Sequence, residues 1–101
     1  MGLEAAFHKE MLNIYEQAKM ECGYNAIRFL QMVGRQGGLG AAKQLLAAEG
    51  YSEGLTRLWE EGRLDISMEA LVLRDPWQKL FTIEELEIAR QRLMELGYIK
   101  D

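Results

Sequence analysis

The alternation of helix-period apolar stripes with single glycines constrains this chain more than any other feature. In its long segments apolar residues recur three and four positions apart, and no segment alternates apolar and polar residues over the length of a strand. Most of the ten glycines stand where such a stripe ends, and glycine readily adopts the left-handed conformation that terminates helices. The pattern predicts an all-α fold, a compact bundle of about five or six short helices forming a single domain over residues 1–101.

Glycines separate the first three expected helices. The first covers about residues 3–21 and Gly23 ends it. Its apolar stripe consists of Leu3, Phe7, Met11, Ile14 and Ala18. Asn25 is expected to cap the second helix by accepting hydrogen bonds from its first free amides. That helix is expected to bury Ala26, Phe29, Leu30 and Val33, and to be broken by Gly34, Gly37 and Gly38. The third covers about residues 39–49 and stops at Gly50.

The second half of the chain carries more explicit cap signals. Ser52 and Ser67 are each expected to cap a short helix. Gly62 ends the first of these, and Pro76 keeps the second, about residues 68–73, from continuing. A threonine followed three residues later by a glutamate predicts a capping box at the start of the last helix. The residues of that box and of the helix stripe, with its stop, are Thr82, Glu85, Leu86, Ala89, Leu93, Leu96 and Gly97.

Residue types that often carry catalysis or bind metals are scarce. His8 is the only histidine and Cys22 the only cysteine, so we expect neither an intrachain disulfide nor a metal cluster. We expect His8 to be solvated beside Glu4, and Cys22 to be half-buried. The glycine-rich residues 35–43 lack the Gly-Lys-Ser/Thr of a phosphate loop and are interpreted as a link between two helices. The prediction is therefore a protein that is not an enzyme, with no catalytic residue, no cofactor and no metal.

Charge and hydropathy indicate the environment of the chain. The net charge is −4, which disfavours a dedicated nucleic-acid-binding domain. No apolar stretch approaches the ~18 residues that suggest a membrane span, and the N-terminus lacks the basic and apolar regions of a secretory signal. We expect a reducing, cytoplasmic location and no membrane partner.

One basic cluster lacks interleaved acidic residues. Arg28, Gln31 and Arg35 share a face of the second expected helix, and Lys43 follows just past the glycine-rich link. Such side chains contact phosphates and base edges, although any helix of a soluble protein also needs a polar face. These four residues support one alternative function, a nucleic-acid-associated, helix-turn-helix-like domain.

The large aromatic residues support the other function. We expect Trp59, Trp77 and Phe81 to close the core, whereas an exposed tryptophan would indicate an anchor for a partner. Six methionines add adaptable apolar surface. The leading hypothesis is a non-enzymatic helical protein-interaction module, whose partner is an unidentified protein or a second copy of the chain in a homo-oligomer.

Two resemblances extend this interpretation. Residues 54–60, 63–73 and 80–90 resemble an uncharacterised bacterial family of small all-helical domains, which implies the helical fold and no established activity. Residues 89–99 resemble the exit of a winged helix-turn-helix recognition helix. Such a domain continues into a two-stranded wing, and the chain stops at Asp101. This departure counts against the transfer of DNA binding.

Overall fold

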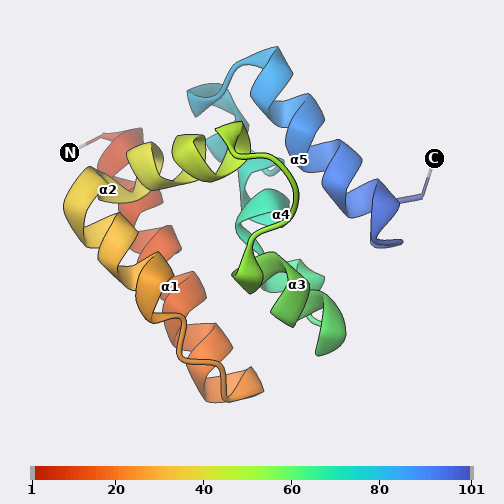
Figure 1. Ribbon diagram of the computed structural model, residues 1–101. Coiled ribbons are helices and arrows are strands. Elements are labelled where there is room, and N and C mark those ends of the chain that lie inside the picture. The colour runs from red at the N-terminus through yellow and green to blue at the C-terminus, as the bar shows by residue number, and fades with distance from the viewer. Residues whose placement is uncertain (1, 101) are drawn as a thin grey trace.

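The computed structural model describes residues 2–100 and contains helices but no strand within them. The elements in chain order are α1 (Leu3–Cys22), α2 (Ile27–Ala47), α3 (Glu53–Glu60), the 3-10 helix η1 (Leu64–Ile66), α4 (Met68–Val72), the 3-10 helix η2 (Trp77–Leu80) and α5 (Ile83–Glu95). The first half of α2 runs back along α1, its second half crosses towards α5, and α3 and α4 lie below this crossing (Figure 1). The all-α prediction is confirmed.

The predicted caps account for most of the helix ends. Gly23 ends α1 in the left-handed conformation, with φ of +66°. The Ser52 hydroxyl accepts a hydrogen bond from the Leu55 amide at 3.0 Å at the start of α3. The Ser67 hydroxyl likewise accepts from the Ala70 amide at 3.1 Å and begins α4. Local side chains therefore satisfy amides that a helix N-terminus leaves without partners.

The glycine-rich segment joins two helical segments of α2 at a sharp kink. The predicted break between a second and a third helix is confirmed, because α2 (Ile27–Ala47) consists of two helical segments that meet at a kink. Only Gly37 leaves the helical conformation, with φ of +80° and ψ of 161°, a region that essentially only glycine occupies. One such residue turns the helix axis, and the helix resumes directly after it.

His8 stabilises this bend from α1. The Gly38 amide has no helical carbonyl to bond, and it donates instead to His8 Nδ1 at 2.9 Å. A Cβ atom on Gly38 would lie 2.7 Å from His8 Cα, so the two backbones approach as closely as a glycine allows. The expectation of a solvated His8 beside Glu4 is wrong, since His8 is partly buried and caps the second half of α2.

Asn25 also has a different role from the predicted one. Ala26 occupies the cap position of α2, and no side chain caps that end. The Asn25 side chain instead accepts a hydrogen bond from the hydroxyl of Tyr15 on α1. The residue therefore links α1 to the turn before α2.

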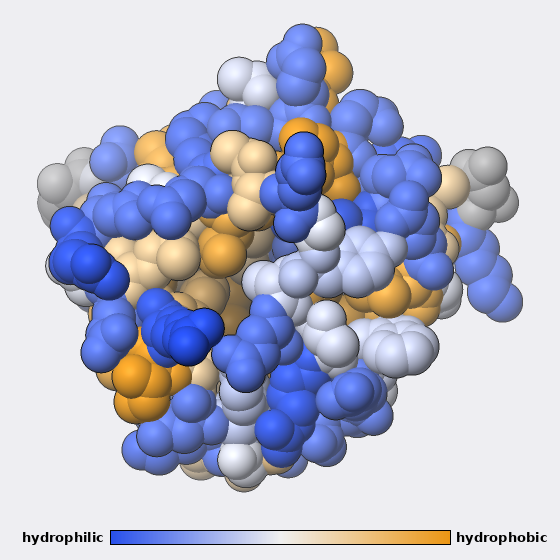
Figure 2. Space-filling model, viewed as in Figure 1, coloured by the Kyte–Doolittle hydropathy of each residue, from blue (hydrophilic) through white to orange (hydrophobic). Residues whose placement is uncertain are grey.

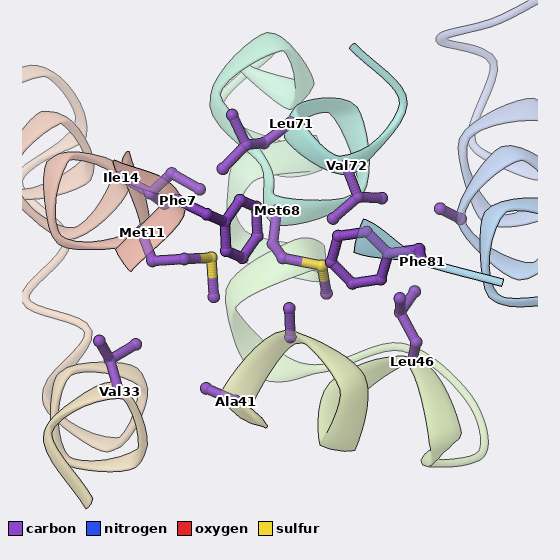
Figure 3. Packing of buried hydrophobic residues seen from close by; sticks show 12 residues of the cluster. Phe7, Met11, Ile14, Val33, Ala41, Leu46, Met68, Leu71, Val72 and Phe81 are labelled. Carbon is purple, nitrogen blue, oxygen red and sulfur yellow. The ribbon is translucent and has the colours of Figure 1, made fainter. Parts of the chain in front are cut away.

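Two apolar clusters form the core. In the larger one, Phe7, Met68 and Phe81 meet between α1, α4 and the second half of α2 (Figure 3). The Phe7 ring lies edge-on to Phe81, with centroids 5.5 Å apart. The smaller cluster joins the end of α1 to α3, η1 and α5, and consists of Ala18, Leu55, Leu58, Leu64, Ile66, Ala70 and Leu93.

A buried ion pair ties the C-terminal elements together. Arg92 on α5 donates to a carboxylate oxygen of Glu69 on α4 at 3.0 Å, and these residues are 6% and 2% exposed. Arg92 also donates to the Ala48 carbonyl at 2.8 Å, just past the end of α2. Burial raises the pKa of Glu69, against the opposing effect of the hydrogen bonds that its carboxylate accepts. No helix among residues 2–100 is long and apolar enough to cross a membrane.

Candidate functional site

The bend of α2 opens a groove between the two halves of that helix and the start of α3. The groove has a volume of about 190 Å³. In Figure 2 this part of the molecule is hollowed, with a hydrophobic floor and a largely hydrophilic rim. This groove is lined by Tyr24, Arg28, Phe29, Met32, Leu45, Ser52, Glu53 and Gly54.

An inner cavity adjoins the floor of the groove. It has a volume of about 40 Å³ and is almost wholly apolar. Its deeper walls come from α1, α3 and α4, and include Ala18, Leu55, Leu58 and Met68. The groove and the inner cavity share five wall residues, namely Tyr24, Phe29, Leu45, Ser52 and Gly54. An apolar group that enters the groove therefore meets further apolar walls beyond it.

Charged groups surround Tyr24 at the rim. Burial and the nearby Glu53 carboxylate raise the pKa of its hydroxyl, while Arg57 and Arg28 oppose this. The hydroxyl thus stays protonated and able to donate. Arg57 lies over the Tyr24 ring at 5.1 Å and also pairs with Glu61 at 3.1 Å. Arg28 is exposed and makes no ion pair within residues 2–100.

Gly54 keeps the mouth of the groove open. It lies in the first turn of α3 and has no positive φ, so its backbone does not require glycine. A Cβ atom there would meet nothing nearer than Ser52 Oγ at 3.9 Å and the Tyr24 ring at 4.0 Å. Packing does not require glycine either, although glycine costs a helix about 1 kcal/mol relative to alanine. The result of having no side chain at this position is open space over Tyr24.

The predicted basic cluster divides at the bend. Arg28, Gln31 and Arg35 are all exposed on the first half of α2. Lys43 lies on the second half, where it pairs with Glu85 of α5 at 2.6 Å and lies 5.1 Å from the Phe81 ring centre. The structure therefore gives Lys43 a partner on α5, and it brings Arg28 to the groove.

The two tryptophans have different environments. Trp77 is partly buried, and its ring lies 5.8 Å from that of Phe7 at the edge of the core. The expectation that Trp59 closes the core is wrong, because its side chain on α3 is 49% exposed. Leu55 and Leu58 are the residues of that helix that are buried in the core. Cys22 is half-buried against the smaller cluster, as expected.

Sequence reasoning found only Arg28 among the groove residues. The remaining walls come from the turn before α2, from both halves of that helix and from the start of α3. They form no local motif, because the bend of α2 brings them together. The one local signal was Gly54, a glycine placed two residues after a helix cap instead of at a helix end.

The described residues hold no arrangement typical of a metal site. Within residues 2–100 no group of three or more histidine, cysteine, aspartate or glutamate side chains is placed to hold a metal ion. The most buried carboxylate, Glu69, already has Arg92 as its partner. The arrangement at the groove is suited to noncovalent binding of an apolar group beside a charged one.

The chain matches no family model, no curated protein and no solved structure. The resemblance to a bacterial helical family, and that of residues 89–99 to a recognition helix, therefore stay predictions.

Proposed function

We propose that this chain is a non-enzymatic helical protein-interaction module that binds a partner protein in the groove. The observation that carries the proposal is the apolar groove with the inner cavity behind it. Interfaces are anchored by a few side chains that enter pockets of this kind, and a helical groove is a recurrent receptor for peptide segments. A cytoplasmic location belongs to the proposal and is supported by the single unpaired cysteine.

Site-specific photocrosslinking in cells tests this function. A photoreactive benzoylphenylalanine replaces Met32 in the groove, and the control places it at Ile83 of α5, which is 78% exposed and outside the groove. We expect a protein adduct from position 32 that resists nuclease, and none of the same mass from position 83. A band at twice the mass of the chain identifies a second copy as the partner. Equal adducts from both positions, or none from position 32, contradict the proposal.

A second candidate function has one specific observation in its favour. Arg28, Gln31 and Arg35 are exposed on one helix, and neither arginine makes an ion pair within residues 2–100, which leaves both free for phosphates. This nucleic-acid alternative predicts binding to labelled DNA or RNA that weakens steeply as salt rises. Arg35→Glu separates the two candidates, because Arg35 is outside the groove. It should abolish nucleic-acid binding and leave the Met32 adduct unchanged.

A further inference from the structure

We infer that the groove recognises a protein segment in which one aliphatic side chain, leucine, isoleucine or methionine, lies next to the carboxylate of an aspartate or glutamate. This inference rests on the proposed function and adds the chemistry of the partner. It follows from the size of the inner cavity, from the missing side chain at Gly54 and from the charge at the rim.

The size of the inner cavity selects an aliphatic anchor. Cavities that bind benzene have volumes of about 150 Å³, whereas the inner cavity has about 40 Å³. An aromatic ring is too large for that space unless the walls move, but the branched end of a leucine or the thioether end of a methionine is narrower. Most of the surface that it would meet is carbon, so the contact removes apolar area from water at about 25 cal/mol per Å².

The absence of a side chain at Gly54 leaves the entrance to the inner cavity open to the anchoring side chain. A side chain at this position would project over Tyr24 and narrow the entrance that the groove and the inner cavity share. Gly34 provides a contrast. Like Gly54 it is a helical glycine, but it lies outside the groove, and a Cβ atom there would meet no atom within 4 Å. Substitutions at the two glycines should therefore affect binding differently.

The hydrogen-bond donors at the rim favour a negatively charged residue beside the anchor in the partner. Arg28 makes no ion pair within residues 2–100, and the nearby Tyr24 hydroxyl donates no hydrogen bond there. Both are donors suited to a carboxylate. Glu53, the acidic residue of the rim, lies in the first turn of α3, where the helix dipole already stabilises it.

Selection of peptides against the whole chain tests the inference. A random peptide library displayed on phage is selected on the wild-type chain and counter-selected on Gly54→Met, which fills the groove. We expect enriched peptides to share leucine, isoleucine or methionine within four residues of aspartate or glutamate. Fluorescence anisotropy should then show at least tenfold weaker binding to Gly54→Met, and unchanged binding to the matched control Gly34→Met. Circular dichroism confirms that both variants are folded.

A charge swap tests the carboxylate directly and does not depend on Gly54→Met folding. Arg28→Glu, an exposed substitution, should weaken the selected peptide at least tenfold, and replacing the peptide's acidic residue with lysine should restore at least part of the affinity. Peptides that bind the groove without an acidic residue, or with an aromatic anchor, overturn this inference but leave the proposed function standing. The absence of any peptide that discriminates against Gly54→Met overturns both. Binding of decanoate alone, with no such peptide, assigns the groove to a free carboxylate and also overturns both.

Discussion

At the scale of single residues, Gly38 allows α2 to approach His8 of α1 closely. The amide of Gly38 donates to the imidazole, and its α-carbon faces the backbone of α1. Neither partner shows this role in the sequence, because the two residues are thirty positions apart and belong to different helices. A histidine opposite an apolar stripe is ordinarily solvated, and only the bend of α2 gives this one an amide to cap.

Gly38→Ala should destabilise the fold while Gly34→Ala stabilises it. The new methyl at residue 38 would lie 2.7 Å from His8 Cα, a backbone atom that moves only with its helix, and overpacking of this kind typically costs about 1–3 kcal/mol. At residue 34 the methyl meets no atom within 4 Å, and alanine is the better helix former by up to about 1 kcal/mol. Urea unfolding of the three proteins measures both effects. Equal shifts of the same sign would contradict the assigned contact.

At the scale of elements, the helix ends were predictable and the path of α2 was not. Ser52, Ser67 and Thr82 cap helices through neighbours three residues away, so a local pattern suffices to identify them. The glycine-rich segment carries the same local signal as a helix stop. That signal is confirmed at Gly37, where the helix is interrupted, but it does not report the direction in which the second half of α2 continues towards α5. Asn25 was misassigned for a similar reason, since Tyr15 of another helix bonds its side chain.

Gly37→Ala tests whether the bend depends on glycine. Its φ of +80° and ψ of 161° lie in a region where other residues are strained by about 1–3 kcal/mol. We expect a loss of stability within that range, without the steric contact that affects Gly38, since nothing lies within 4 Å of a Cβ at residue 37. Thermal unfolding monitored at 222 nm reports the change. A variant as stable as wild type would show that α2 has another way to bend.

The capping box of α5 also takes part in a contact with α2, because its Glu85 pairs with a lysine of that helix. Glu85 accepts from the Thr82 amide at 2.9 Å and pairs with Lys43 of α2 at 2.6 Å. Partial burial raises the pKa of Glu85, but the hydrogen bonds from Lys43 and Thr82 outweigh it, so the pKa lies below its ordinary value of 4.5. Thr82→Ala should cost about 1 kcal/mol through loss of the cap.

Glu85→Gln separates the charge from the cap. Glutamine keeps the capping box and removes the ion pair. Because the folded pKa is depressed, the charge stabilises the protein above the ordinary pKa of 4.5, and this contribution is lost as pH falls through the lower folded value. The difference in unfolding free energy between wild type and Glu85→Gln should therefore be present at pH 7 and shrink by pH 3. A difference that is constant over this range would assign the effect to packing.

At the scale of the whole molecule, the groove and the buried ion pair are both products of tertiary structure. The groove takes its walls from the turn before α2, from both sides of the bend and from α3. The pair joins residues twenty-three positions apart on α4 and α5. Hydrophobic periodicity predicted the all-α class because it reports which face of a helix is buried. It does not report which helices meet, so neither the groove nor the partner of Arg92 was predictable.

The ion pair has a second consequence for the whole fold. Arg92 donates both to Glu69 and to the Ala48 carbonyl, and thereby joins α4, α5 and the end of α2. Desolvation opposes the charge on each side chain, and their mutual attraction offsets it. Removing one partner leaves the other charged and buried, which typically costs about 3–5 kcal/mol. Removing both leaves no uncompensated charge.

A double-mutant cycle therefore gives the last prediction. Glu69→Met and Arg92→Met should each destabilise the fold by about 3–5 kcal/mol, and the double variant should lose clearly less than the sum of the two. Some loss should remain in Arg92→Met and in the double variant, because the Ala48 carbonyl loses its donor in both. Arg90→Met, an exposed change on the same helix, should stay within about 0.5 kcal/mol of wild type. Urea unfolding of all five proteins measures the cycle. Additive losses would show that the two side chains stabilise the fold independently, and that the link between α4 and α5 rests on their apolar contacts.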